Sequence, residues 1–309
     1  MTDTALYLQQ LINGLSLGAM YSLLALGFTL VYGILELINF AHFSVFMIAS
    51  FIGMWALNLL GLEGQSTILT GFSLVGALAF AFVVTMVLSG CLGVAIERLA
   101  LRPMRAIRGT AAMITTIGVS YILLNTILLT VGAGSENFPN PMPNLRWDVF
   151  GATLRLREVL IWGVAIVLMV GLHLFVTRTR LGKAMRATAQ DSEAARMMGV
   201  DVDRVIITAF FLGSALAGAA ALIFGLYYNY TSFIIGYSAG LRAFTAAVLG
   251  GIGSVTGAML GGILIGLIES FGGQLVSTRW TDVIIFSILV LVLVVVPTGL
   301  LGRAAPTKS

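Results

Sequence analysis

The feature that most constrains this chain is a series of long apolar runs interrupted by few charged residues. Hydrophobic residues make up 59% of the sequence and charged residues 10%, and no Lys or Arg precedes Arg98. A soluble globular domain contains about 25% charged residues, so this composition excludes an ordinary water-soluble fold. The sequence therefore predicts an all-α, polytopic membrane protein with a single transmembrane domain over residues 1–309.

The number of membrane crossings follows from the length of the apolar runs. A helix needs about 20 apolar residues to cross the hydrocarbon of a bilayer. The segment 238–251 is short and contains Arg242, so it either spans or is re-entrant, and eight or nine crossings are expected. The candidate spans are 8–31, 43–60, 69–96, 112–132, 159–177, 205–228, 238–251, 255–275 and 282–299.

The distribution of basic residues predicts the orientation, because Lys and Arg are enriched in short cytoplasmic loops. Most of the Lys and Arg residues form three groups along the chain. With nine crossings all three groups fall on one side of the membrane, which places the C-terminus in the cytoplasm, the N-terminus outside and the 133–158 loop outside. The N-terminal segment lacks the positive region of a cleavable signal peptide, so the first span is expected to remain in the protein. The groups are Arg98, Arg102, Arg105 and Arg108; Arg178, Arg180, Lys183, Arg186, Arg196 and Arg204; and Arg303 and Lys308.

The outer loop 133–158 has its own local pattern. Pro139, Pro141 and Pro143 favour extended backbone. Residues 147–156 then predict a short β-hairpin that turns near Gly151. This loop either covers the membrane surface or docks an external partner, and the sequence supports both interpretations equally.

The segment 178–204 is the longest water-compatible stretch of the chain. Two short helices fit it, Leu181–Ala189 and Ser192–Met198, with Asp191 as the N-cap of the second and Gly199 as its stop signal. A helix of about seven residues is marginal by itself in water, so the second helix is expected to dock on another surface. Helical spacing predicts that this docking face consists of Ala194, Ala195 and Met198.

The residues of this second helix resemble a known signature. Glu193-Ala194-Ala195, followed by Gly199, resembles the EAA loop of permeases in ATP-binding-cassette (ABC) importers. The longer form of that signature ends in Ile-x-Leu-Pro, which Val205-Ile206-Ile207 does not match, and this favours the divergent group that includes branched-chain amino acid permeases. The resemblance implies that the loop inserts into a groove of a cytoplasmic ATPase. The implied coupling residues are Gln190, Asp191, Glu193, Ala194, Ala195, Met198 and Gly199.

Further motifs extend the resemblance over almost the whole chain. Asn39-Phe40-Ala41-His42 is similar to the NFAHG element of branched-chain permeases, with Phe43 in place of the final Gly, and the runs 97–103, 114–120 and 241–254 are similar to the smaller, H-type permease of these importers. Urea and short-chain amide permeases share much of this pattern, but urea permeases of this type often carry a long N-terminal region that is absent here.

The resemblance also implies an assembly. The chain would form half of a translocation pore in the bacterial inner membrane, beside a second, M-type permease. Two cytoplasmic ATPases would bind ATP and Mg, a periplasmic binding protein would deliver Leu, Ile or Val, and this chain would bind no cofactor and catalyse no covalent chemistry. Whether the permease pair contains one or two kinds of chain stays open.

Polar and small residues within the apolar spans are candidates for pore lining or helix packing. Glu36 and His42 either mark an unwound helix that lines a pathway or lie at the cytoplasmic interface, which is favoured for Glu36, while the role of Asn39 stays open. Arg242 and Glu269 either pair or lie at opposite ends of their helices. Small residues recur at every fourth position and seal either this chain's own bundle or a partner permease. These stripes are Gly253, Gly257 and Gly261; Gly213, Ala217, Ala221 and Gly225; and Gly14, Gly18 and Ser22.

Other classes of protein have less support. His42 and His173 have no Glu or Cys at ligand spacing, the single Cys91 provides no disulfide or metal framework, and 250–254 lacks the Lys of a phosphate-binding loop. The basic residues flank apolar spans and form no nucleic-acid patch. A secondary transporter or channel would show more paired charges at the membrane midplane, so it remains the alternative to an ABC permease.

Overall fold

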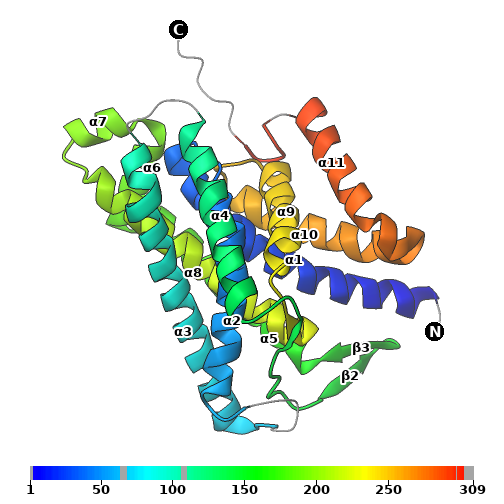
Figure 1. Cartoon of the computed structure of the whole chain (residues 1–309). Helices are drawn as coiled ribbons and strands as arrows, with labels where there is room; N and C mark the ends of the chain where they lie inside the picture. Colours follow the sequence, from blue (N-terminus) through cyan, green and yellow to red (C-terminus); the bar gives the residue numbers. More distant parts are fainter. Residues whose placement is uncertain (1–2, 63–67, 106–109, 297, 303–309) are drawn as a thin grey trace.

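The computed structural model describes residues 3–62, 68–105, 110–296 and 298–302, and these form a helical bundle (Figure 1). Arg108, Arg303 and Lys308 of the basic groups lie outside the described residues. The helices are α1 (Asp3–Leu35), α2 (Ala41–Asn58), α3 (Gly71–Ile96), α4 (Ala111–Thr130), α5 (Leu156–Arg178), α6 (Arg180–Gln190), α7 (Ser192–Met197), α8 (Val202–Tyr228), α9 (Ile235–Gly250), α10 (Val255–Gly272) and α11 (Thr281–Val295).

The all-α membrane architecture is confirmed, whereas the expected count of crossings is not. The described residues contain seven helical segments long and apolar enough to cross a membrane. Two features explain the difference from eight or nine. The 16-residue α9 is shorter than the length a crossing requires. The helices α10 and α11 are joined by a π-helical turn (Gly273–Ser277) and a 3₁₀ turn (Thr278–Trp280), so they form one helical segment, Val255–Val295.

The core of the bundle is built from α1, α2, α8, α9 and α10. The 33-residue α1 runs alongside α10 and also contacts α8 and α9. It is about 50 Å long at 1.5 Å per residue. Figure 1 shows α10 and the N-terminal part of α1 lying across the direction of α3 and α4. This arrangement buries α1 on several sides at once.

The small-residue stripes form the contacts within this core. A Cβ atom at Gly27 of α1 would meet the carbonyl oxygen of Gly213 on α8, and one at Gly213 would meet the carbonyl oxygen of Gly27. Ser22 of α1 donates a hydrogen bond to the Met259 carbonyl on α10 at 2.7 Å. The backbones of these helices therefore touch, which only small residues permit.

The stripe on α10 is divided between two roles. Gly257 and Gly261 lie against Gly250 and Ala246 of α9. Gly253 lies in the turn between the two helices, where its φ of +90° suits glycine. The sequence left open whether these glycines face this chain's own bundle or a partner permease. Gly257 and Gly261 seal this chain's own bundle and do not face a partner permease.

Two small antiparallel pairs of strands cover one end. The predicted hairpin is confirmed as β2 (Arg146–Val149) and β3 (Ala152–Arg155), which turn at Phe150 and Gly151. The other pair, β1 (Glu136–Asn137) with β4 (Tyr230–Thr231), was not predicted, because strands of two residues leave no periodic signal.

The molecule therefore has two distinct ends, joined by α5. The hairpin end contains β2, β3 and the start of α1, since Gln9 accepts a hydrogen bond from the Thr153 backbone N–H at 2.9 Å. The loop end contains α6, α7 and the end of α1 (Figure 1). The prediction that the 133–158 and 178–204 loops lie on opposite faces is confirmed, in that the two loops lie at opposite ends of the bundle.

Candidate functional site

The loop end displays the two short helices predicted from the sequence. The Thr179 hydroxyl accepts a hydrogen bond from the Gly182 N–H at 3.0 Å and caps α6. The Asp191 carboxylate accepts bonds from the N–H groups of Glu193 and Ala194, both at 2.9 Å, and caps α7. Gly199 follows α7 with a φ of +83°, a conformation that suits glycine as a helix stop. The predicted cap at Asp191 and stop signal at Gly199 are confirmed, whereas the Thr179 cap was not predicted.

The helix α6 anchors this loop to the bundle. Its Met185 is buried against Val205 and Ala209 of α8. Arg186 donates a hydrogen bond to the carbonyl of Val176, in the last turns of α5. Contacts on both neighbouring helices hold α6 in place, so a force applied to the loop would be passed to α5 and α8.

The exposed face of α7 differs from the predicted one. Ala195 is only 5% exposed and its carbonyl accepts a hydrogen bond from the Val200 N–H at 3.0 Å, whereas Met198 is 85% exposed. Met197, which the sequence analysis missed, is 89% exposed. The predicted docking ridge of Ala194, Ala195 and Met198 is therefore wrong in its central member, since Ala195 packs inward. Both faces of α7 contain small or apolar residues, and spacing alone did not distinguish them.

Exposed polar residues surround the methionines of α7. Gln190, Glu193 and Arg196 are exposed, as are the small residues Ala194 and Gly199. Two exposed methionines at the tip of a loop form a flexible apolar contact surface, which the polar residues keep soluble. We call Ala194, Met197 and Met198 the α7 face.

An arginine network beside this loop was also missed. Arg105 pairs with Glu97, which is fully buried, and with Asp203 at 2.8 Å, while Arg102 lies 3.2 Å from the same Asp203. Glu97 begins a π-helical turn after α3, and Asp203 lies in the first turn of α8. The network ties the 97–105 segment to the chain that leaves α7. Arg105 and Asp203 are 98 residues apart in the sequence, so no local pattern reveals this pair.

A second arginine network lies inside the bundle. Arg242 of α9 is 3.0 Å from Glu269 of α10 and 2.7 Å from Asp282 of α11, and its guanidinium lies 3.4 Å from the Tyr21 hydroxyl of α1. The pairing of Arg242 with Glu269, left open above, is thus observed. Asp282 and Tyr21 were not predicted as partners. Side chains of four helices, α1, α9, α10 and α11, meet at this one guanidinium.

Asn39 and His42 lie at the junction of α1 and α2 and are both buried. The Asn39 side chain accepts a hydrogen bond from the Ala41 N–H at 3.1 Å, and the His42 ring nitrogen Nε2 lies 3.3 Å from the Leu24 carbonyl oxygen. Glu36, by contrast, is exposed at the end of α1. These contacts show that Asn39 and His42 bond to the backbone at the junction of α1 and α2.

Phe43, which replaces the usual Gly of the NFAHG element, has a counterpart on α9. A Cβ atom at Gly240 would collide with the Phe43 ring, and one at Gly236 would meet the Phe43 carbonyl oxygen. The large side chain on α2 is therefore accommodated by glycines on the facing helix. The substitution does not open the junction.

A mostly apolar helical bundle, with seven segments among the described residues that are long enough to cross a membrane, defines a polytopic membrane protein. The family model for the permease component of branched-chain amino acid transport systems matches residues 10–293. The chain belongs to this family.

Curated relatives match at full length. The chain is 41% identical over 314 residues to the high-affinity branched-chain amino acid transport system permease protein LivH of Escherichia coli K12, covering 100% of both chains. It is 40% identical over 306 residues to the corresponding permease protein BraD of Pseudomonas aeruginosa, covering 98% of each. Similarity to the E. coli permease protein LivM is weaker, 28% over 295 residues, covering 84% of this chain and 69% of LivM. No solved structure matches the chain.

Proposed function

We propose that this chain is one half of the translocation pore of an ABC importer for branched-chain amino acids, and that α6 and α7 transmit the movement of a cytoplasmic ATPase to the pore. The relatives are named as permeases for these amino acids, which supports the substrate class. The weaker similarity to LivM supports an M-type permease as the other half. A soluble binding protein delivers the substrate, and two ATPases supply the energy.

The observation that carries this proposal is the α7 face. Met197 and Met198 are almost fully exposed at the tip of a loop whose other helix is held by α5 and α8. An apolar surface that is rigidly connected to two long helices fits a coupling element, because coupling needs a part that moves as a unit between two positions. The orientation follows: the loop end faces the cytoplasm, and the hairpin end with the N-terminus faces outward.

The arginine networks complete the proposed mechanism. Displacement of α7 toward or away from the membrane pulls on α8 through residues 198–202, and the Arg105–Asp203 pair extends the same pull to the end of α3. Within the bundle, the Arg242 network keeps α9, α10 and α11 together with α1 during the movement. The displacement of α7 thus reaches the pore through α3, α5 and α8.

Substitution of Met197 tests the proposal. In the reconstituted transporter, Met197→Asp places a charge in an apolar contact and should reduce binding-protein-stimulated ATPase activity and leucine uptake about tenfold or more, since desolvating an unpaired charge costs a few kcal/mol. Met197→Leu keeps the apolar surface and should retain both activities. Full uptake by Met197→Asp would rule out α7 as the coupling element, and uptake of urea in place of leucine would redirect the substrate assignment.

Ala195→Asp is less informative. Because Ala195 is buried within the loop, a charge there would disturb the fold of α7 itself as well as any contact with the ATPase. Loss of coupling in that variant would therefore not identify the contact surface. Met197 avoids this ambiguity, because its side chain has few neighbours within the chain.

A further inference from the structure

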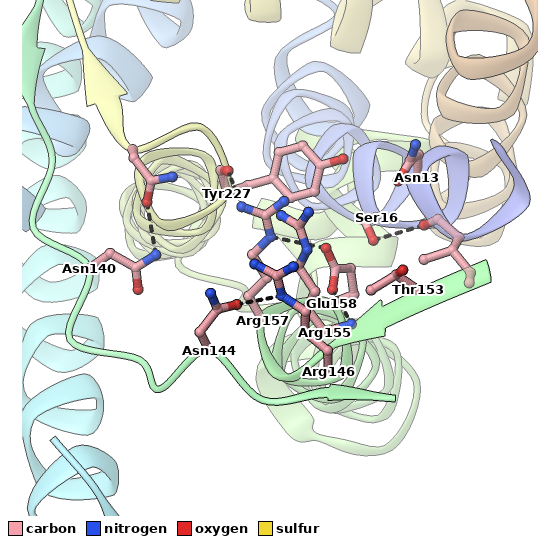
Figure 2. A network of polar contacts seen from close by, with 12 residues as sticks. Asn13, Ser16, Asn140, Asn144, Arg146, Thr153, Arg155, Arg157, Glu158 and Tyr227 are labelled. Atoms are coloured by element: carbon pink, nitrogen blue, oxygen red, sulfur yellow. Dashed lines mark hydrogen bonds and ion pairs between the residues drawn. The ribbon is translucent and has the colours of Figure 1, made fainter. Parts of the chain in front are cut away.

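A polar cavity of about 310 Å³ opens at the hairpin end, between the hairpin and the extended segment before it. Three arginines line it, Arg146, Arg155 and Arg157, and none of the described residues that line it is Asp or Glu. Figure 2 shows the three arginine side chains gathered together, with Asn144 beside Arg146. The cavity therefore presents a concentrated positive charge at the end of the molecule opposite the α7 face.

The strand register brings two of these arginines together. Arg146 of β2 and Arg155 of β3 are directly opposite each other in the antiparallel hairpin. Like charges at directly opposed positions destabilise a pair of strands. Two such arginines at the wall of a cavity favour a negatively charged partner, which would relieve their repulsion.

The carboxylates of the described residues compensate only part of this charge. Glu158 is buried and accepts a hydrogen bond from Arg157 Nε at 2.9 Å, while Arg157 also lies over the Tyr227 ring, 4.9 Å from its centroid. Among the described residues, the Arg146 side chain bonds to the neutral Asn144 side chain, at 2.9 Å, and to no carboxylate. The Arg155 side chain contacts the Glu158 backbone at the start of α5 and likewise forms no ion pair with a described carboxylate. The charges of these two guanidiniums are therefore left unpaired within the described part of the chain.

We infer that this cavity receives the carboxylate of an Asp or Glu side chain carried by the soluble binding protein, an assignment that rests on the proposed function. Opposed guanidiniums match a planar carboxylate, which accepts two parallel N–H···O bonds from an arginine. The side-chain amide of Asn140, held by Asn229 at 2.8 Å, lines the same cavity and supplies further polar groups. Docking then places the delivered substrate over the hairpin end of the bundle.

The lining argues against two other occupants. A free amino acid carries an ammonium group beside its carboxylate, and the described residues that line the cavity include no acidic side chain to pair with it. An anionic lipid would approach from the membrane. The residues that line the cavity instead belong to the hairpin, to the loops at Ile68 and 140–145, to the C-terminal cap of α8 and to the first turn of α5. An anion that enters from the water side fits this placement.

Removal of one guanidinium tests the inference. Arg155→Gln in the complete transporter, in nanodiscs, should weaken the docking of leucine-loaded binding protein about tenfold, and adding Arg146→Gln should weaken it further and flatten its salt dependence. Arg279→Gln, an exposed arginine outside the cavity lining, is the matched control and should dock normally. Basal ATPase activity should be unchanged in all three variants, which shows that they are folded.

A charge swap identifies the partner group. Each acidic residue on the docking face of the binding protein is replaced by Arg, and one such variant should dock weakly to the native transporter and regain affinity with Arg155→Glu. Native docking by the Arg146→Gln/Arg155→Gln transporter would overturn the inference and leave the proposed function intact. Failure of the unsubstituted transporter to bind any binding protein would overturn both.

Two further measurements separate the other occupants. Binding of free L-leucine without binding protein, if lost in Arg155→Gln, would reassign the cavity to the amino acid. Docking that is normal in phosphatidylcholine nanodiscs for every variant, together with loss of bound phosphatidylglycerol in Arg155→Gln, would reassign it to a lipid headgroup. The carboxylate site requires both of these to be unaffected by Arg155→Gln.

Discussion

The core helices and the flanking helices of this protein are buried to very different extents. In the most apolar stretch of each helix, 83% of α1 and 78% of α2 and α8 is buried, against 22% of α5 and 11% of α4. Both groups are strongly apolar, with mean hydropathy of 1.7 for α1 and 1.8 for α4. Hydrophobicity therefore does not distinguish helix–helix contact from exposure. Small residues do, because the core helices meet through glycine and serine backbones whereas α4 presents large side chains outward.

This difference has a physical cause in the bilayer. Lipid is as apolar as leucine, so helices gain little by burying large side chains against one another, and close backbone approach becomes the stabilising contact. The exposed faces of α4 and α5 are accordingly free to contact lipid or a second permease. The comparison leads to predictions in which the same substitution has opposite outcomes in the two regions.

The largest effect is expected at the crossing of α1 and α8. Gly213→Leu forces a side chain into the backbone of Gly27, where nothing flexible can move aside, and should abolish the folded protein, since overpacking costs about 3 kcal/mol or more at a rigid contact. The yield of monodisperse protein in size-exclusion chromatography measures this. Gly118→Leu on α4, where a Cβ atom has open space, is the control and should give normal yield.

A smaller but clear effect is expected for the contact of α9 with α10. Gly257→Leu would meet the carbonyl of Gly250, near the ends of the two helices, and should lower the thermal unfolding temperature and the amount of protein in the membrane. Gly171→Leu on α5 has open space and should be neutral. Equal stability of these two variants would contradict the division into core and flank.

The Arg242 network should show an intermediate effect that depends on the partner. Arg242→Leu leaves Glu269 buried without its cation, and should destabilise the bundle by about 3 kcal/mol. The double variant Arg242→Leu/Glu269→Leu removes both charges and should recover most of that loss, because replacing a buried pair by apolar residues is often neutral. Thermal unfolding of the four members of this cycle checks the prediction, and a double variant no better than the single one would contradict it.

The smallest effect is expected on the flank. Leu129 of α4 is 85% exposed, so Leu129→Ala removes little buried surface and should change stability by less than about 0.5 kcal/mol. Leu222→Ala on α8, which is fully buried, should cost about 2–5 kcal/mol. If Leu129→Ala is as harmful as Leu222→Ala, α4 has a protein partner on that face.

Local chemistry was predictable from the sequence, while contacts between distant segments were not. Asp191, Gly199 and the hairpin turn at Gly151 act on neighbours within a few residues, so their roles follow from the amino-acid types alone. Arg242 with Asp282 and Arg105 with Asp203 are set by how helices pack, which periodicity in an almost uniformly apolar chain does not reveal.

The inward side of α7 was missed for a similar reason. Ala194, Ala195 and Met198 satisfy helical spacing, but a helix of six residues has two plausible faces, and the cap at Asp191 and the turn at Gly199 determine which one packs. The prediction of eight or nine crossings was not confirmed, because the length of an apolar run does not show whether α9 spans the membrane or whether α10 and α11 form one segment. The buried side of α7 and the number of crossings both depend on how the helices pack against one another, which the sequence pattern does not contain.

The most direct test of the central claim, that the α7 face contacts the cytoplasmic ATPase, is site-specific photo-crosslinking. A photoreactive amino acid is placed at Met197 in the assembled transporter, and a second sample carries it at Phe150, which is equally exposed at the hairpin end. The account predicts that position 197 crosslinks to the ATPase and that position 150 does not. Crosslinking of the ATPase from position 150, or from neither position, would contradict it.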